Sequence, residues 1–206
     1  MGADEARRSV TRIKDGRAWR IGSGAEVAWI QDGTSTTTAI TAAVPPMFDA
    51  YATVELPEPG ADADGLWSDE QQRHDRALLA VLSRHAGSQP WWLGYLDTGV
   101  DDLVFPDAPP VTLYADWRYV LVEAGPQQAA AWRSEKSGSF WKGPLPNLMF
   151  PADRSWLVST LWDDDWTCMG GPAALVDDLL RDSELGPRAR RVALEDDATP
   201  PGHQAW

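Results

Sequence analysis

Residues 91–96 read Trp-Trp-Leu-Gly-Tyr-Leu, and residues 117–123 read Trp-Arg-Tyr-Val-Leu-Val-Glu. Both stretches are rich in aromatic and other large apolar residues, which pack well on the pleated surface of a sheet. Residues 111–114 form a similar stretch, and only Ala115 and Asp116 separate it from residues 117–123. Strands joined by so short a turn pair antiparallel. The sequence therefore predicts a mainly antiparallel central sheet.

Other stretches add a second hairpin and three helices to this sheet. Apolar residues at 155–162 and 166–169 indicate the hairpin, whereas residues 26–31 and 51–56 are weaker strand candidates. Residues 69–86 have helical periodicity, and further helices are expected from Pro126 and Pro172. We therefore expect an α+β fold whose mainly antiparallel central sheet has helices packed on one face.

The charge distribution divides the chain into three parts. Residues 1–20 hold six basic and three acidic residues, and we expect them to form a flexible basic arm. Residues 21–194 are expected to form a single α+β domain, which suits a chain of 206 residues. Residues 195–206 are acidic and then read Pro-Pro-Gly, which predicts a disordered tail. The first residues are polar and lack the apolar segment of a secretory signal, so we expect a cytoplasmic protein.

Composition excludes several functional classes. The chain has 31 acidic against 18 basic residues, and a net charge of -13 argues against nonspecific binding to a phosphate backbone. The mean hydropathy of -0.37 and the lack of a long apolar run argue against a membrane span. A single cysteine excludes an internal disulfide framework. No nucleic-acid partner, membrane partner or cofactor is expected.

The twelve tryptophans are the most unusual feature of the composition. Most of them are expected to fill the core, since each buries about 200 Å². Trp91 and Trp92 are adjacent on a strand and therefore face opposite sides of the sheet. If the side without helices is open, Trp92 belongs to an exposed aromatic patch of the kind that marks binding surfaces. The candidate partner-binding residues are Trp92, Asp97, Asp101, Asp102 and Asp107, with Asp163, Asp164 and Asp165 as a second acidic rim.

Residues 96–102 read Leu-Asp-Thr-Gly-Val-Asp-Asp and end an apolar stretch. This segment resembles the catalytic motif of the single-motif, retroviral-type aspartic peptidases. In that family two chains each contribute one aspartate, and the paired carboxyl groups share a proton to activate water. The resemblance implies a dimer in which Asp97 is catalytic, and residues 168–170 are similar to the element that braces the family's active loop. It covers seven residues, so the chain is not assigned to the family on this ground.

Two further features are candidates for chemistry. Asp163, Asp164 and Asp165 could coordinate a hard cation such as Mg²⁺, but a solvated hairpin turn is favoured because no complementary ligand spacing is visible. Cys168 precedes the helix expected from Pro172, and a helix N-terminus lowers the pKa of a thiol. With His74 or His85 nearby it could be a nucleophile, whereas the alternative is a small buried residue that ends a strand.

The sequence therefore favours a noncatalytic, acidic protein-binding domain. Its partner is expected to be a basic protein, as for an immunity protein that neutralises a nuclease toxin or a regulatory adaptor. The alternative is a hydrolase, either an aspartic-peptidase-like dimer that uses Asp97 or an enzyme with a metal site at Asp163–Asp165. Asp97 and Cys168 are the candidate catalytic residues of that alternative.

Overall fold

The chain is described by a computed structural model that defines residues 10–58, 69–99, 103–133, 145–162 and 164–203. Its strands are β1 (Val10–Lys14), β2 (Arg17–Ile21), β3 (Ala50–Glu55), β4 (Trp91–Leu96), β5 (Val111–Leu113), β6 (Trp117–Ala124), β7 (Leu148–Pro151), β8 (Leu157–Ser159), β9 (Trp166–Gly171) and β10 (Ala189–Val192). They form one sheet in the order β1-β2-β6-β4-β7-β8-β9-β3-β10, and β5 pairs with β6 outside this path. The pairings between neighbours are antiparallel, as the sequence predicts.

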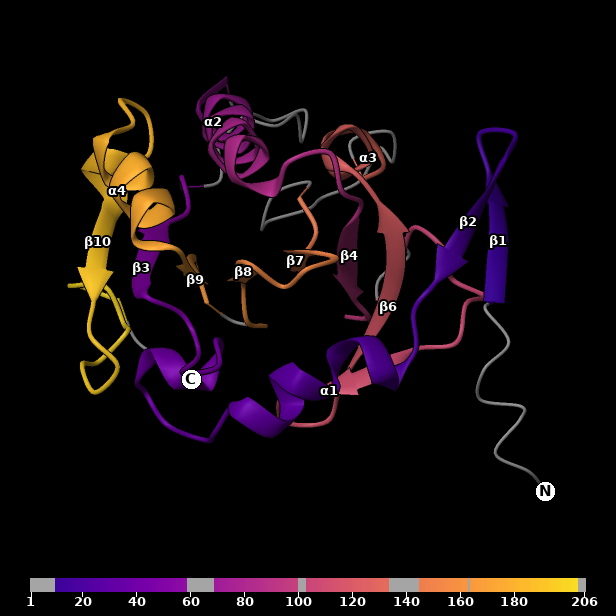
Figure 1. Ribbon diagram of the computed structural model, residues 1–206, viewed down its shortest axis with the longest axis horizontal. Coiled ribbons are helices and arrows are strands. Elements are labelled where there is room, and N and C mark those ends of the chain that lie inside the picture. Colours follow the sequence, from indigo (N-terminus) through magenta and orange to yellow (C-terminus); the bar gives the residue numbers. More distant parts are fainter. Residues whose placement is uncertain (1–9, 59–68, 100–102, 134–144, 163, 204–206) are drawn as a thin grey trace.

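Helices cover both faces of this sheet. They are α1 (Gly24–Gly33), α2 (Asp69–Ala86), α3 (Pro126–Ala131) and α4 (Ala173–Arg181), with short 3-10 turns η2 (Ile40–Ala42) and η3 (Gly186–Arg188). Figure 1 shows α2, α3 and α4 on one face and α1 on the other, and each face carries its own cluster of buried apolar residues. The α+β fold with its antiparallel sheet is thus confirmed, with α1 as the helix that lies opposite the rest. None of the helices in the described ranges is both long and apolar enough to cross a membrane.

The helix α1 occupies the stretch that the sequence analysis interprets as a weak strand at 26–31. Ser23 and Glu26 explain the difference, because they form a capping box: the Ser23 hydroxyl accepts from the Ala25 N–H, and the Glu26 carboxylate accepts from the Ser23 N–H at 2.8 Å. Val27 and Ile30 are fully buried on the inner side of the helix. Helical spacing of these two apolar residues therefore outweighs their β-propensity.

The strand β4 is buried along its whole length, so both of its tryptophans lie in the core. Trp91 belongs to the cluster under α2, where its ring meets that of Trp156 edge-on with 4.9 Å between centroids. Trp92 belongs to the opposite cluster and is only 4% exposed. Trp91 and Trp92 thus face opposite sides of the sheet, as predicted. The side on which Trp92 lies is covered by α1 and its neighbours rather than open.

The described residues near both ends of the chain are more ordered than the sequence suggests. Residues 10–20 of the expected flexible arm belong to the β1–β2 hairpin, which turns at Asp15-Gly16 with positive φ angles of 53° and 71°, whereas residues 1–9 lie outside the described ranges. Asp-Gly is a favoured sequence for such a two-residue turn. In the expected disordered tail, Ala198 is buried and its N–H donates to the Thr38 carbonyl at 2.9 Å. The expectation of a disordered tail is therefore corrected for residues 195–203, whereas residues 204–206 lie outside the described ranges.

Substitution of Gly16 tests the β1–β2 turn. The Gly16→Ala variant should lose about 1 kcal/mol of unfolding free energy, because a Cβ is unfavourable at positive φ although no atom lies within 4 Å of it. Gly24→Ala is the matched control, since Gly24 also has open space around its Cβ position but begins α1 at ordinary φ. Urea denaturation should show no loss for Gly24→Ala. Equal losses for the two variants would contradict the turn geometry.

Candidate functional site

Two connections meet at one end of the sheet, where β4 and β8 end and β6 and β9 begin. The β5–β6 hairpin contributes Tyr114 and Trp117, and the β8–β9 connection contributes Trp162. The rings of Trp117 and Trp162 are 6.1 Å apart between centroids, and both side chains are only partly buried. The Tyr114 hydroxyl donates to the Ala43 carbonyl at 3.1 Å and lies 2.8 Å from Ser159 Oγ. These contacts hold the hairpin against the end of β8.

Several carboxyl groups lie at this end of the sheet. Asp116 lies in the β5–β6 turn and is exposed, and Asp165 is exposed just before β9. Asp97 follows β4, where its N–H donates to the Arg118 carbonyl at 2.8 Å, and Glu55 ends β3 opposite Trp166. We call this surface the aromatic–acidic end; it comprises Glu55, Asp97, Tyr114, Asp116, Trp117, Trp162 and Asp165.

The aromatic–acidic end unites two groups of residues that the sequence analysis treats separately. Asp97 and Asp165 are brought to the same end of the sheet by the antiparallel order of the strands between them. Asp164 is 7% exposed, so it points inward rather than forming part of the rim. Asp101, Asp102 and Asp163 lie outside the described ranges.

The other partner-binding candidates lie elsewhere. Trp92 is buried on the α1 face, where the guanidinium of Arg20 covers its ring at 4.3 Å from the centroid. The expectation of an exposed Trp92 is therefore wrong, because that face of the sheet is not open. Asp107 is exposed, and its carbonyl accepts from Arg12 Nη2 of β1 at 2.7 Å. Trp117 and Trp162 are among the aromatic residues that remain partly accessible.

The two catalytic candidates have surroundings that suit a structural role. The Asp97 carboxylate accepts from the Gly99 N–H at 3.2 Å, an Asx turn, and lies 3.8 Å from Arg118 Nη1. Cys168 is 2% exposed in β9, and burial raises the pKa of its thiol, with the charge of Asp164 adding to the effect. A raised pKa keeps the thiol protonated, which is the opposite of what a nucleophile requires. In the sheet order, β7 and β8 separate β9 from the Asp97 strand.

No group of three or more His, Cys, Asp or Glu side chains that could hold a metal ion occurs in the described part of the chain. His85 contacts Asp178 Oδ2 at 2.9 Å and is therefore engaged between α2 and α4. The remaining titratable groups of interest lie in the interior, on the helix α2.

His74 and Asp75 form a buried polar site that the sequence analysis does not identify. His74 is fully buried, and neither ring nitrogen has a hydrogen-bond partner within the described ranges. Desolvation lowers the pKa of His74 to about 4. Desolvation also raises the pKa of Asp75 to about 7, although Gln71 Nε2 donates to its Oδ1 at 2.8 Å. Both residues line a cavity of about 20 Å³ together with Thr160 and Thr167 of the sheet end. Between about pH 4 and 7 the pair is mostly uncharged, because neither group can be ionised cheaply at this depth.

No family model, curated protein or solved structure matches this chain. In the described part of the chain, the aromatic–acidic end combines partly accessible aromatic rings with acidic side chains.

The buried pair predicts opposite pH dependences for two variants. Between pH 4 and 7 the Asp75 carboxyl group is ionised in the unfolded chain but protonated in the folded protein. Ionisation therefore stabilises the unfolded chain, and the contribution of Asp75 to the unfolding free energy falls as the pH rises. In Asp75→Asn this penalty is absent, and its stability relative to the wild type should rise by up to about 4 kcal/mol from pH 4 to 7 and then stay constant. His74→Phe leaves only the Asp75 effect, so its own stability should fall over the same range. Urea denaturation at pH 4.5, 5.5, 6.5 and 8 measures both, and parallel pH profiles would contradict the account.

The hydroxyl of Tyr114 predicts a stability difference between two tyrosines. Tyr114→Phe should lose about 1–3 kcal/mol, because it leaves the Ala43 carbonyl and Ser159 Oγ without this partner. Tyr119→Phe is the matched control, since the buried Tyr119 hydroxyl has no partner within the described ranges. Its removal should be neutral or stabilising. Thermal unfolding compares the two, and equal melting temperatures would refute the role of Tyr114.

Proposed function

We propose that the protein is a noncatalytic binding domain that holds a basic protein partner at the aromatic–acidic end. The observation that carries this proposal is the partly buried pair of Trp117 and Trp162, together with two exposed carboxylates: Asp116, which precedes Trp117, and Asp165, in the same connection as Trp162. Tryptophan and tyrosine are the residues that most often dominate interface energetics, since a large rigid ring is buried at little cost in entropy.

Charge supports a basic partner. The chain has a net charge of -13, and the aromatic–acidic end carries Glu55, Asp97, Asp116 and Asp165. The Asp97 carboxylate lies 3.8 Å from Nη1 of Arg118, whose side chain is 62% exposed. Such a negative surface accelerates association with a positively charged protein and disfavours acidic competitors. A protein that binds nucleic acid through a basic face has the complementary charge.

The backbone of the β5–β6 turn also supports a binding role. Tyr114 and Asp116 have positive φ angles of 55° and 63°. Aspartate tolerates this conformation, whereas a tyrosine adopts it at a cost of about 1–2 kcal/mol. The hydrogen bond from the Tyr114 hydroxyl to the Ala43 carbonyl offsets part of that cost. Strain of this kind collects at functional sites, and here it fixes the turn that presents Trp117.

Within this proposal the protein acts in the cytoplasm as an immunity-type or regulatory partner of a basic protein. The noncatalytic role is supported by the buried, protonated thiol of Cys168 and by the Asx turn of Asp97. An aspartic-peptidase-like dimer would require a second Asp97 across a two-fold axis.

Variants at the aromatic–acidic end test the proposal. The partner is isolated by affinity capture from the native host, identified by mass spectrometry and purified for binding kinetics. Trp117→Ala should weaken binding by about 30-fold or more, as for a hot-spot aromatic residue. The double variant Asp116→Asn/Asp165→Asn should lower the association rate several-fold at low salt and less at high salt, because only electrostatic steering is reduced. Asparagine also tolerates the positive φ of position 116.

The matched control is Asp107→Asn, which removes an exposed carboxylate beside β1. It should change the association rate by less than twofold. Binding that is unchanged in both Trp117→Ala and the double aspartate variant would refute the proposal. So would a dimeric protein with peptidase activity that is abolished by Asp97→Asn.

A further inference from the structure

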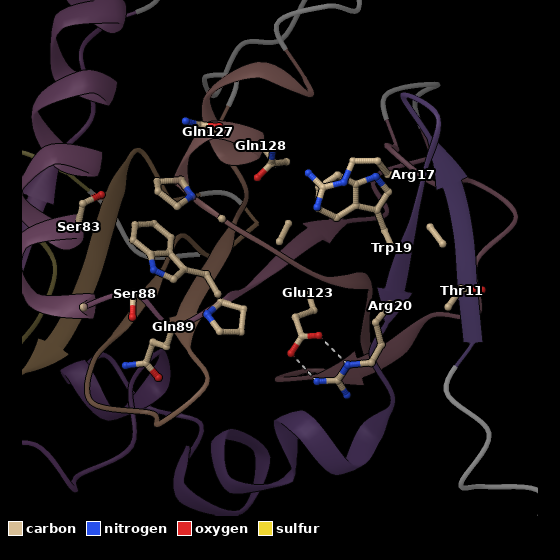
Figure 2. A pocket seen from close by; sticks show the side chains of 17 residues that line it. Thr11, Arg17, Trp19, Arg20, Ser83, Ser88, Gln89, Glu123, Gln127 and Gln128 are labelled. Carbon is tan, nitrogen blue, oxygen red and sulfur yellow. Dashed lines mark hydrogen bonds and ion pairs between the residues drawn. The ribbon is translucent and has the colours of Figure 1, made fainter.

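A cleft lies at the other end of β6, between the β1–β2 hairpin, the start of β4 and the start of α3 (Figure 2). Its volume is about 830 Å³, which is in the usual range for ligand-binding clefts. Trp117 and Ala124 mark the two ends of β6, so the cleft is about 24 Å along the strand from the aromatic–acidic end. The two surfaces are therefore separate, and an inference about the cleft does not depend on the proposed function.

The cleft occupies a place where the sheet is interrupted. The ladder between β2 and β6 contains only two residue pairs, Arg20 with Glu123 and Ile21 with Val122. In the same register the next pairs would be Trp19 with Ala124 and Ala18 with Gly125, but the strands part here and all four residues line the cleft. In an antiparallel hairpin with a two-residue turn, the N–H and C=O of Ala18 point away from β1. The main chain of Ala18 is therefore directed into the cleft as an open strand edge.

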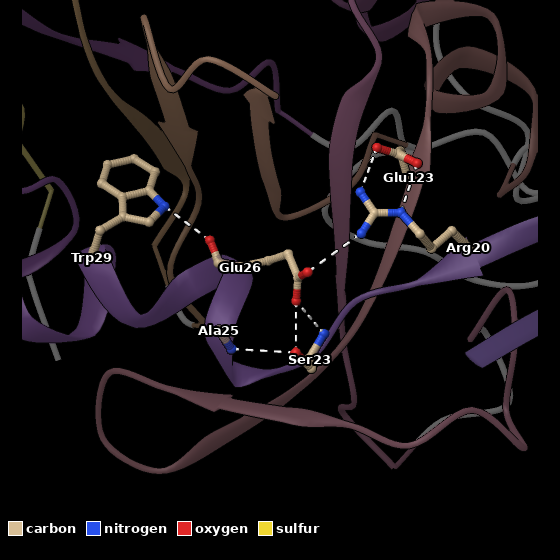
Figure 3. A network of polar contacts seen from close by, with 6 residues as sticks. All are labelled: Arg20, Ser23, Ala25, Glu26, Trp29 and Glu123. Atoms are coloured by element: carbon tan, nitrogen blue, oxygen red, sulfur yellow. Dashed lines mark hydrogen bonds and ion pairs between the residues drawn. The ribbon is translucent and has the colours of Figure 1, made fainter. Parts of the chain in front are cut away.

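A fixed ion-pair network stands at the point where the strands part. Arg20 donates to both carboxylate oxygens of Glu123, at 2.8 and 2.6 Å, and also reaches Glu26 at 3.4 Å (Figure 3). The hairpin itself is held by Trp19, whose ring meets Trp132 edge-on at 4.9 Å between centroids. The cleft is thus preformed, and the charge of Arg20 is already compensated.

Arg17 supplies an uncompensated positive charge at the rim. Its guanidinium lies 4.7 Å from the centroid of the Trp19 ring, and it has no ion pair within the described ranges. Stacking on the indole limits the conformations of the side chain, so that its donors are prearranged for a carboxylate. The exposed guanidinium of Arg17 is a local donor group that favours an anionic group on the ligand.

We propose that this cleft binds an extended peptide segment that adds to the open edge at Ala18 and places a carboxylate on Arg17. An extended peptide has the alternating N–H and C=O groups that such an edge pairs with, a mode of recognition known as β-augmentation. The side chains of Gln127 and Gln128 on α3 face the same cleft and add hydrogen-bonding groups beside the bound main chain.

The experiment uses the full chain and a displayed library of random heptapeptides as the probe. The strongest binder is then synthesised in three forms: unchanged, with its acidic side chain replaced by the amide, and with N-methyl groups on its central residues. The enriched peptides should share one acidic position. Arg17→Gln should weaken binding of the unchanged peptide about tenfold, since it removes a charge-assisted hydrogen bond, but should not affect the amide form. The N-methylated form should bind at least tenfold more weakly because it cannot pair with a strand edge.

Arg76→Gln is the matched control, since Arg76 is an exposed arginine on α2 outside the cleft. It should leave the affinity unchanged, as should Trp117→Ala at the opposite end of β6. The proposal is overturned if no peptide prefers the wild type over Arg17→Gln. It is also overturned if N-methylation has no effect, which would indicate a purely ionic contact, or if Trp117→Ala abolishes binding, which would place the peptide at the aromatic–acidic end.

Discussion

Burial of β4 from both sides is the constraint on which the rest of the structure depends. The strand lies between β6 and β7 in the middle of the sheet, and each of its six residues is buried. Two apolar clusters are needed to cover it, one under α2, α3 and α4 and the other beside α1. A sheet covered on both faces can meet a partner only at its strand ends and edges. The aromatic–acidic end and the cleft are such places, and they lie at opposite ends of β6.

Double coverage also explains why titratable groups lie in the interior. His74 and Asp75 are on α2, which must pack closely over the sheet, and both are removed from water there. Burial shifts their pKa values in opposite directions, so that both groups are mostly neutral between about pH 4 and 7. A neutral pair avoids the large cost of an unpaired buried charge. The interior beneath α2 is therefore polar at His74 and Asp75.

Much of the fold follows from local patterns, and the exceptions have physical reasons. The strands β4 and β6 and the helix α2 are predictable because their apolar runs or helical periodicity extend over six or more residues. α1 is short, and its decisive feature is the capping box of Ser23 and Glu26 rather than its apolar pattern. Asp97 and Asp165 are identified by type, but their convergence depends on strand order, which is a long-range property. The alternation of Trp91 and Trp92 is likewise predictable, whereas coverage of the second face by α1 is not.

Fluorine NMR of protein labelled with 5-fluorotryptophan tests the central claim most directly, because it reports on each indole separately. With a soluble paramagnetic agent, the resonances of Trp117 and Trp162 should broaden in the free protein and be protected once the basic partner is bound. Trp92 should be unaffected in both states, since it is 4% exposed beneath Arg20. Broadening of Trp92 in the free protein, or an unprotected Trp117 in the complex, would contradict the account.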